Sequence, residues 1–351
     1  MKDAPLLNLT LAIVLAFLIG ALLIIGRPIL LPIMTAIIAV YIMLSTSRAM
    51  QQLPVIGILP LPVIRFLVML VFALAITFFA IIIAATVREI SSVAPVYEAN
   101  LDAMFHKIAD RFDFDSQDIW DELRAVTIDR IDLNALVLSL LGSFTNVSAA
   151  VFLVVIYAAF LMAERADFEH KIKAALGNEA QAEKTLGIVA EINTKISDYL
   201  AIKTLINIIL GAVSFVVLWA MGIDFAMFWA IAIALLNYIP YVGSYLGVMF
   251  PVALSLAQFG SLGYTIALTL LLVGCQFVLG NIVEPKMIGR QMNLSPFVVL
   301  IALSVWIAIW GIPGAIFAIP MTSIMAIVLA GFDSTRFMAL LLAERVDQEG
   351  A

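Results

Sequence analysis

Charged residues are scarce in this sequence, and their scarcity decides its class. Asp, Glu, Lys and Arg make up 13% of the 351 residues, whereas a soluble globular protein carries about 25%. Hydrophobic residues reach 64%, which is more apolar surface than one soluble core of this length could bury. Because no alternating strand pattern of a membrane β-barrel is present, we predict an all-α, polytopic integral membrane protein.

Several catalytic signatures are missing as well. The sequence has no Gly-x-x-x-x-Gly-Lys-Ser/Thr loop, so we expect no ATP hydrolysis by the chain itself. It has no His-Glu-x-x-His motif, and its two histidines, His106 and His170, lie in different polar segments. The segment 243–247 lacks the Gly-x-Ser-x-Gly spacing of a nucleophile elbow, and the single cysteine, Cys275, excludes an internal disulfide. We therefore predict neither an enzyme nor a cofactor, since an intramembrane enzyme would have no assembled catalytic group.

Long apolar segments dominate what is present. A hydrocarbon core of about 30 Å requires about 20 helical residues, and the full-length candidates are 6–26, 28–45, 62–87, 144–163, 203–222 and 262–281. The first lacks a cleavage site after it, so we expect a retained helix rather than a signal peptide. Pro28 cannot continue that helix, which predicts a tight helical hairpin at Gly26-Arg27-Pro28. With two interrupted apolar regions added, we expect about eight membrane segments.

Basic residues in the loops predict the orientation. Arg48 follows the second span and Arg65 begins the third, and the turn 282–295 carries Lys286 and Arg290. The segment 164–203 holds six further basic residues, which are Arg165, Lys171, Lys173, Lys184, Lys195 and Lys203. By contrast, 88–143 has eleven acids against five basic residues. We predict a bacterial inner-membrane protein with cytoplasmic basic loops, an acidic outer segment and both termini in the cytoplasm.

Two segments read as lying outside the membrane. Residues 89–143 have the spacing of short amphipathic helices, and 181–200 predicts a cytoplasmic helix that continues into the next span. An acidic cluster (Asp110, Asp113, Asp115, Asp118 and Asp121) suggests calcium, but positions 118 and 124 lack the Gly and Glu of that loop. A solvated acidic face is therefore the better interpretation, and we predict no metal site. The expected divisions are 1–87, 88–143, 144–202, 203–335 and 336–351.

The two interrupted apolar regions are the informative ones. The first breaks into 225–238 and 245–259, and the second into 297–311 and 314–332. Arms of 14 or 15 residues span only about 21–23 Å, and Pro and Gly at each break free backbone groups that lipid cannot satisfy. Such segments indicate a transporter's binding site. Re-entrant hairpins with tips near the midplane, full double crossings and ordinary kinked helices all remain open.

Polar stripes on two neighbouring spans support the same location. Gln276, Gly280 and Glu284 recur every four residues, with Asn281 beside them, and the other stripe consists of Lys203, Asn207, Gly211 and Ser214. Ionisable groups at membrane depth are functional candidates. Glu284 could couple transport to protons or cations, or be an interfacial carboxylate paired with Lys286 or Arg290. For Asp224, a helix N-cap before Phe225 is favoured over a coupling role.

Taken together, the motifs resemble the autoinducer-2 exporter family, and the whole chain fits the family's outline. They are Asn-Tyr-Ile-Pro-Tyr-Val-Gly at 237–243, Asn-Ile-Val-Glu-Pro-Lys-Met-Ile-Gly-Arg at 281–290, Asn-Leu-Ser-Pro at 293–296 and Trp-Gly-Ile-Pro-Gly at 310–314, with Pro-Met-Thr at 320–322. The resemblance implies a secondary transporter, either of the quorum-sensing signal autoinducer-2 or of sodium or lithium against protons. It also implies a homo-oligomer, for which a pentamer is the expected form. The family's Glu-Pro-Lys-x-x-Gly-Arg motif falls on Glu284, Pro285, Lys286, Gly289 and Arg290.

The predicted site combines both hairpin tips with the two polar stripes. Its binding residues are Asn207, Asn237, Pro240, Gly243, Gln276, Asn281, Glu284, Gly311, Pro313 and Gly314, with Lys203, Lys286 and Arg290 as motif or interface residues. In an exporter, Asn207, Asn237, Gln276 and Asn281 would bind a small hydroxylated solute; in an antiporter, Glu284 would exchange a proton for a monovalent cation. A passive oligomeric channel is the third possibility. The expected partners are the lipid bilayer, the transported solute or ion, and further copies of the chain, but no nucleic acid.

Overall fold

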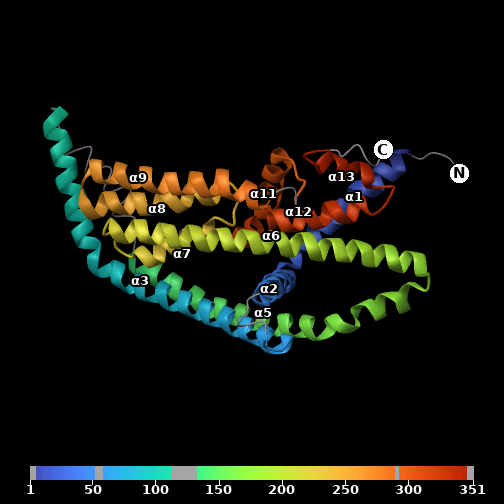
Figure 1. Cartoon of the computed structure of the whole chain (residues 1–351). Coiled ribbons are helices and arrows are strands. Elements are labelled where there is room, and N and C mark those ends of the chain that lie inside the picture. Colours follow the sequence, from blue (N-terminus) through green and yellow to red (C-terminus); the bar gives the residue numbers. More distant parts are fainter. Residues whose placement is uncertain (1–4, 52–57, 113–132, 289–291, 346–351) are drawn as a thin grey trace. The chain divides into compact units, whose positions relative to one another are not determined.

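The computed structural model describes residues 5–51, 58–112, 133–288 and 292–345, and these residues form helices joined by turns (Figure 1). The helices are α1 (Pro5–Ile25), α2 (Arg27–Gln51), α3 (Leu61–Phe112), α5 (Leu133–Leu176), α6 (Glu179–Ala220), α7 (Ala226–Leu236), α8 (Val242–Phe259), α9 (Leu262–Phe277), the π-helix η1 (Val278–Val283), α10 (Glu284–Ile288), α11 (Pro296–Trp310), α12 (Ile312–Ala330) and α13 (Arg336–Leu342).

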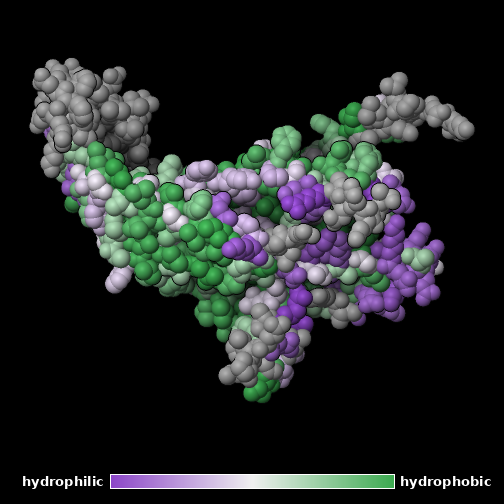
Figure 2. Space-filling model, turned by 45° about the horizontal axis from the view of Figure 1, so that its top comes forward, coloured by the Kyte–Doolittle hydropathy of each residue, from purple (hydrophilic) through white to green (hydrophobic). Residues whose placement is uncertain are grey.

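Six of the described helices contain stretches long and apolar enough to cross a membrane. The stretches are Arg27–Arg48, Pro62–Ile83, Glu179–Ala220, Val242–Phe259, Leu262–Met287 and Ile312–Ala330. Their outward side chains are apolar, as Leu262, Ile266 and Leu270 on α9 illustrate. Figure 2 shows a broad hydrophobic surface over α8 and α9. An exposed apolar surface of this extent fits a lipid environment, so the chain is a polytopic helical membrane protein, as predicted.

The chain folds into two compact units, and each contains one broken helical hairpin. Unit 1 comprises residues 1–49, 150–201 and 290–351, and unit 2 comprises 50–149 and 202–289. Unit 2 has a hydrophobic core built from α6, α7, α9, η1 and the connection between α6 and α7. It is made of Leu210, Leu218, Ile223, Ala230, Ile233, Leu268, Leu272 and Leu279. The domain boundaries predicted from the sequence stay a prediction.

The predicted hairpin at residues 26–28 is wrong. Only Gly26 separates α1 from α2, and helical hydrogen bonds continue across it, from Gly26 N to Leu22 O at 2.8 Å and from Leu30 N to Gly26 O at 2.8 Å. A reversal between helices needs a loop of about 2–5 residues, which is absent here. Pro28 therefore does not reverse the chain, because position 28 falls in the first turn of α2, where a missing N–H costs little.

The helix of the third span is also longer than predicted. Short amphipathic helices were expected from residue 89 onward, but α3 continues without a break to Phe112, with Pro95 inside it. The acidic cluster lies mostly in 113–132, outside the described residues. By contrast, the predicted helix at 181–200 does continue into the following span, because α6 is a single helix of 42 residues.

In unit 2, α7 and α8 form the first broken hairpin at the predicted position. Tyr241 has φ 59° and ψ −60°, and Val242 N donates to Pro240 O at 2.6 Å, which is a three-residue γ-turn of the rare, strained type. The first arm, α7, has only 11 residues. The arms pack closely because Gly243 lies against the Leu236 carbonyl and Gly247 lies over Ile233.

In unit 1, α11 and α12 form the second broken hairpin, also as predicted. Its turn is the single residue Gly311, whose φ of 69° suits glycine. Gly314 then packs against the Trp306 carbonyl, and Trp306 Nε1 donates to Thr322 Oγ1 at 3.1 Å across the two arms. The fully buried Trp310 anchors this tip by donating from Nε1 to the Leu23 carbonyl of α1 at 3.0 Å.

Candidate functional site

A chain of buried polar side chains lies in unit 2, where the tip of the α7–α8 hairpin meets α6. Asn237 ends α7, and its Nδ2 donates to Asn207 Oδ1 at 2.8 Å. The Ser244 hydroxyl donates to Asn237 Oδ1 at 3.3 Å from the start of α8. Asn207 and Asn237 are only 2% and 5% exposed. The two asparagines selected from the sequence therefore touch each other, although 30 positions separate them.

Small residues allow this approach of α7 to α6. A Cβ added at Gly211 would lie 3.0 Å from Ala234 Cβ and 3.3 Å from Ala230 O, so a larger residue would push α7 away. The predicted stripe on α6 is confirmed, because Lys203, Asn207, Gly211 and Ser214 are all buried. Close backbone approach is the usual effect of small residues between membrane helices.

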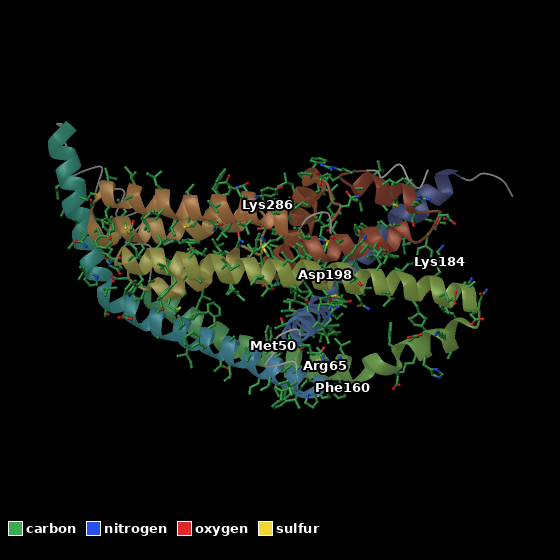
Figure 3. All side chains as sticks on the ribbon, viewed as in Figure 1. Met50, Arg65, Phe160, Lys184, Asp198 and Lys286 are labelled. Atoms are coloured by element: carbon green, nitrogen blue, oxygen red, sulfur yellow. The ribbon has the colours of Figure 1, made fainter. Side chains whose placement is uncertain are left out.

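A buried ion pair extends the polar cluster. Lys203 Nζ lies 2.6 Å from Glu284 Oε1, and their side chains are 7% and 21% exposed. Glu284 is the first residue of α10 and directly follows η1. The sequence predicts Lys286 or Arg290 as the partner of Glu284. In the structure Lys286 is exposed (Figure 3), and Arg290 is outside the described residues. The correction is that Lys203, expected only as a motif or interface residue, is the partner of Glu284.

Two hydroxyl groups that the sequence prediction missed complete the cluster. Thr204 Oγ1 and Tyr238 Oη lie 2.7 Å apart, and each is adjacent in sequence to a predicted site residue. The Asn207 amide nitrogen faces the Tyr238 hydroxyl without making a well-formed hydrogen bond. The signal that could have found Tyr238 was its place in the broken segment 237–244.

Two buried amide nitrogens have no hydrogen-bond partner among the described residues, and they are Asn207 Nδ2 and Gln276 Nε2. Leaving a buried donor unsatisfied costs about 1–3 kcal/mol, so these groups are free to bind a polar solute or water. Gln276 was predicted for the site and has the required donor. Asn281, predicted with it, is exposed and does not join the buried cluster.

A second polar network ties α3 to the opposite end of the hairpin. Tyr97 Oη donates to Asp224 Oδ2 at 2.7 Å, Asp224 N donates to Gln258 Oε1 at 3.0 Å, and Asn100 Nδ2 donates to Gln258 O at 2.6 Å. Burial raises the pKa of Tyr97, and the hydrogen bond to the Asp224 carboxylate raises it further. The predicted N-cap role of Asp224 is wrong: α7 is preceded by Phe225 in a left-handed conformation with no side-chain cap.

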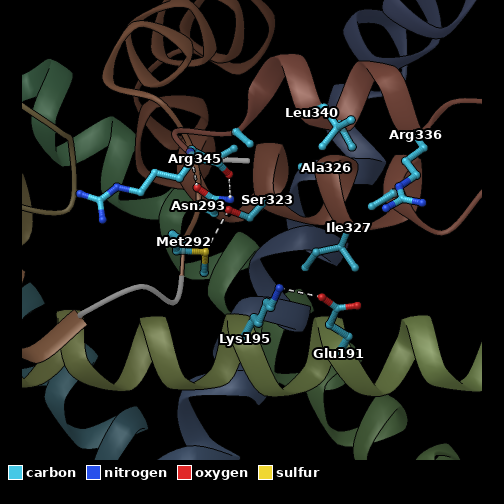
Figure 4. Close-up of a pocket in the computed structure, with 14 residues that line it drawn as sticks. Glu191, Lys195, Met292, Asn293, Ser323, Ala326, Ile327, Arg336, Leu340 and Arg345 are labelled. Atoms are coloured by element: carbon cyan, nitrogen blue, oxygen red, sulfur yellow. Dashed lines mark hydrogen bonds and ion pairs between the residues drawn. The ribbon is translucent and has the colours of Figure 1, made fainter. Parts of the chain in front are cut away.

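Unit 1 contains a pocket of about 260 Å³ between α6, the segment before α11, α12 and α13 (Figure 4). Much of its polar lining is already paired: Lys195 binds Glu191 at 2.6 Å, and Asn293 makes two hydrogen bonds to the backbone of Arg345. The Arg345 side chain points away from the other labelled residues (Figure 4). This pocket therefore offers a solute fewer uncommitted polar groups than the cluster in unit 2.

The remaining predicted residues lie at the two hairpin tips. Pro240 is half-buried and Gly243 buried in unit 2, whereas in unit 1 Gly311 is the turn of the α11–α12 hairpin and Pro313 and Gly314 lie in the first turn of α12. These five residues shape backbone and contribute no polar side chain. The prediction that the two tips meet near the midplane stays a prediction.

Broken membrane helices that bring amides, hydroxyls and a buried ion pair together define a class: helical membrane transporters with an internal polar site. The chain belongs to the AI-2E transporter family, because the model of the "AI-2E family transporter" matches residues 11–332. Membership agrees with the resemblance found in the sequence and indicates a transporter family, not an enzyme family.

Three curated relatives also carry the names of transport proteins. The chain is 33% identical over 187 residues to a "Putative transport protein" of Borreliella burgdorferi, covering 53% of this chain and 51% of the relative. It is 25% identical over 281 residues to "Putative transport protein YhhT" of Escherichia coli K12, covering 80% and 79%. It is 29% identical over 217 residues to "AI-2 transport protein TqsA" of the same organism, covering 61% and 62%.

Proposed function

We propose that this protein is a secondary transporter of the bacterial inner membrane that moves a small, neutral, hydroxylated solute of the autoinducer-2 type. Support for the solute class comes from the donors and acceptors of Asn207, Asn237, Thr204 and Tyr238, which suit hydroxyl groups. The name of the relative TqsA points the same way. The proposed orientation follows from the basic loops and puts both termini in the cytoplasm, with the acidic segment outside.

One observation favours a neutral solute over a cation: Glu284 already has a cation beside it. The Lys203 ammonium lies 2.6 Å from this carboxylate, so the pair adds no net charge to the cluster. A transported cation would have to displace a lysine tethered to α6. A neutral solute needs only hydrogen bonds, and the buried nitrogens of Asn207 and Gln276 are available for them.

The α7–α8 hairpin is the element we propose to move during transport. Its tip stores backbone strain at Tyr241, and strained backbone at a functional site supports a switch between conformations. The arms are re-entrant in this proposal, with the α11–α12 hairpin entering from the other side of the membrane. Assembly into a homo-oligomer completes the proposal and rests on the family resemblance alone.

The second candidate function is sodium- or lithium-for-proton antiport, and the largely buried Glu284 carboxylate is the observation that favours it. The two functions make different predictions for Glu284→Gln. In an antiporter, this variant abolishes pH-driven cation flux in inverted vesicles. In a transporter of a neutral solute, it leaves the solute's dependence on the pH gradient unchanged, although the rate can fall because Lys203 loses its partner.

Transport assays in proteoliposomes test the proposal. We expect saturable flux of autoinducer-2 and a fall of about tenfold for Asn207→Ala, since losing a hydrogen bond to a buried polar partner costs about 1–3 kcal/mol. Asn193→Ala is the matched control, because Asn193 lies on the same helix but bonds Tyr41 at 2.7 Å in unit 1; its flux should stay within about twofold. Unsaturable flux would indicate a passive channel, and flux of sodium without autoinducer-2 would support the antiporter.

A further inference from the structure

The Lys203–Glu284 ion pair places two charged side chains where little water reaches them, which costs free energy. Both side chains are withdrawn from water, at 7% and 21% exposure. Desolvation costs several kcal/mol per ion even after relaxation, so a buried pair is weak evidence of stabilisation and often replaceable by apolar residues. A role in the site explains the charges better than a contribution to folding.

The location of the pair supports such a role. Lys203 lies one position before Thr204 and four before Asn207, both members of the polar cluster. Glu284 directly follows η1, a six-residue π-helix, and π-helical turns occur frequently at functional sites. The Lys203 ammonium lies beside the Glu284 carboxylate, at a position that a monovalent cation bound to this carboxylate would also take.

We propose that Lys203 is a tethered cation: its ammonium fills a monovalent-cation site formed by Glu284, so that transport needs no bound coupling ion. This inference rests on the function proposed above and explains why transport would not depend on a bound coupling ion. Removing the ammonium leaves a largely buried carboxylate without its counter-ion, and an aqueous monovalent cation can then take the place of the ammonium. Among the described residues, Lys203 from α6 is the charged group that pairs with Glu284, and Lys286 on the same helix as Glu284 is exposed.

A thermal-melting experiment on purified full-length protein tests the cation site without any solute. Melting temperatures are compared in sodium chloride and choline chloride at equal ionic strength and equal pH. The wild type and Lys203→Arg should melt at the same temperature in both salts. Lys203→Met should gain about 3 °C in about 150 mM sodium, because an ion that binds only the folded state stabilises it.

Two further variants show whether the response belongs to Glu284. Lys203→Met/Glu284→Gln should lose the sodium response, since the carboxylate is gone. Lys195→Met is the matched control: Lys195 pairs with Glu191 on the same helix at the same 2.6 Å, but both side chains are exposed, so no sodium response should appear. The proposal is overturned if Lys203→Met shows no sodium response, or if the double variant retains it.

Failure of Lys203→Met to fold is also informative. Folding in sodium but not in choline supports the proposal. Aggregation of Lys203→Met in both salts contradicts the proposal. If Lys203→Met/Glu284→Gln then folds, sodium cannot replace the ammonium beside Glu284. If that double variant also fails to fold, the protein requires Lys203 independently of Glu284.

A flux measurement separates this inference from the function on which it rests. Wild-type flux of autoinducer-2 in proteoliposomes should be equal in sodium and choline, whereas Lys203→Met should transport about fivefold faster in sodium than in choline. Equal rates for the variant in both salts contradict the tethered cation. Absence of flux in every protein counts against the proposed substrate, and the melting temperatures still decide the role of Lys203.

Discussion

Replacing Gly243 by alanine tests the geometry of the α7–α8 tip most directly. A Cβ at this position would overlap the Leu236 carbonyl oxygen and lie 2.5 Å from the Leu236 carbonyl carbon and 3.2 Å from Asn237 Cα. These neighbours are backbone atoms, which cannot rotate away as a side chain could. Because carbon atoms in contact prefer about 3.5–4.0 Å, α7 and α8 must separate by about 1 Å at the tip.

The expected destabilisation follows from that displacement. Overpacking a close contact costs about 1–3 kcal/mol, and the gain in helix propensity from Gly to Ala returns at most about 1 kcal/mol. A net loss of about 2 kcal/mol would lower the melting temperature of a chain of this length by about 3 °C. The displacement also moves Asn237, whose Nδ2 lies 2.8 Å from Asn207 Oδ1, so transport should fall more than stability alone explains.

Gly247→Ala provides the matched control, one turn further along α8. A Cβ there would lie 3.4 Å from Ile233 Cα and 3.5 Å from Ile233 Cγ1, which is ordinary contact. We therefore expect its melting temperature to stay within about 1 °C of wild type and its flux to be nearly unchanged. Equal melting temperatures for the two variants, measured in the same detergent, would refute the close packing of the tip.

Three further substitutions test other contacts. Tyr97→Phe should lower the free energy of unfolding by about 1 kcal/mol, because it removes a hydrogen bond. The pKa of Tyr97 is raised in the folded protein. The wild type should therefore lose stability as pH rises above about 10, where only the unfolded chain releases this proton. The variant should show a flatter alkaline limb in melts from pH 8 to 11. Trp310→Phe removes the hydrogen bond to the Leu23 carbonyl and should lower stability by about 1 kcal/mol, and unchanged melting would contradict that contact. A double-mutant cycle of Thr204→Val and Tyr238→Phe should give a coupling energy of about 1 kcal/mol, whereas additive effects would mean the 2.7 Å contact is not a hydrogen bond.

The helix breaks could be predicted because their causes are local. Pro240 and Gly311 interrupt apolar runs, and both positions lie at turns between packed arms. The α6 stripe could be predicted because helical periodicity determines which residues share a face. Both inferences need only neighbouring residues, so one sequence was sufficient.

Contacts between distant segments could not be predicted in the same way. Periodicity indicated that Lys203 and Glu284 lie on polar faces, but not that these faces meet across 81 positions; the nearby Lys286 was the default partner. Asp224 was read as an N-cap because its sequence neighbours allow it, whereas the real partner, Tyr97, lies 127 positions away. The length of α3 was missed because polarity changes after the span although the helical hydrogen bonding does not.

The rise along α6 gives the depth of the proposed site in the membrane. At the base of the hairpin, Gln258 Nε2 donates to Gly222 O at 2.8 Å; at its tip, Asn237 bonds Asn207. Residues 207 and 222 are fifteen positions apart, which is about 22 Å along a helix. If the base lies at one surface of a core about 30 Å thick, the tip stops inside the hydrocarbon layer, which favours re-entry over a full crossing. Lys203 lies about 6 Å further along the helix, close to the opposite surface, where an aqueous cation can reach the Glu284 carboxylate once the ammonium is removed.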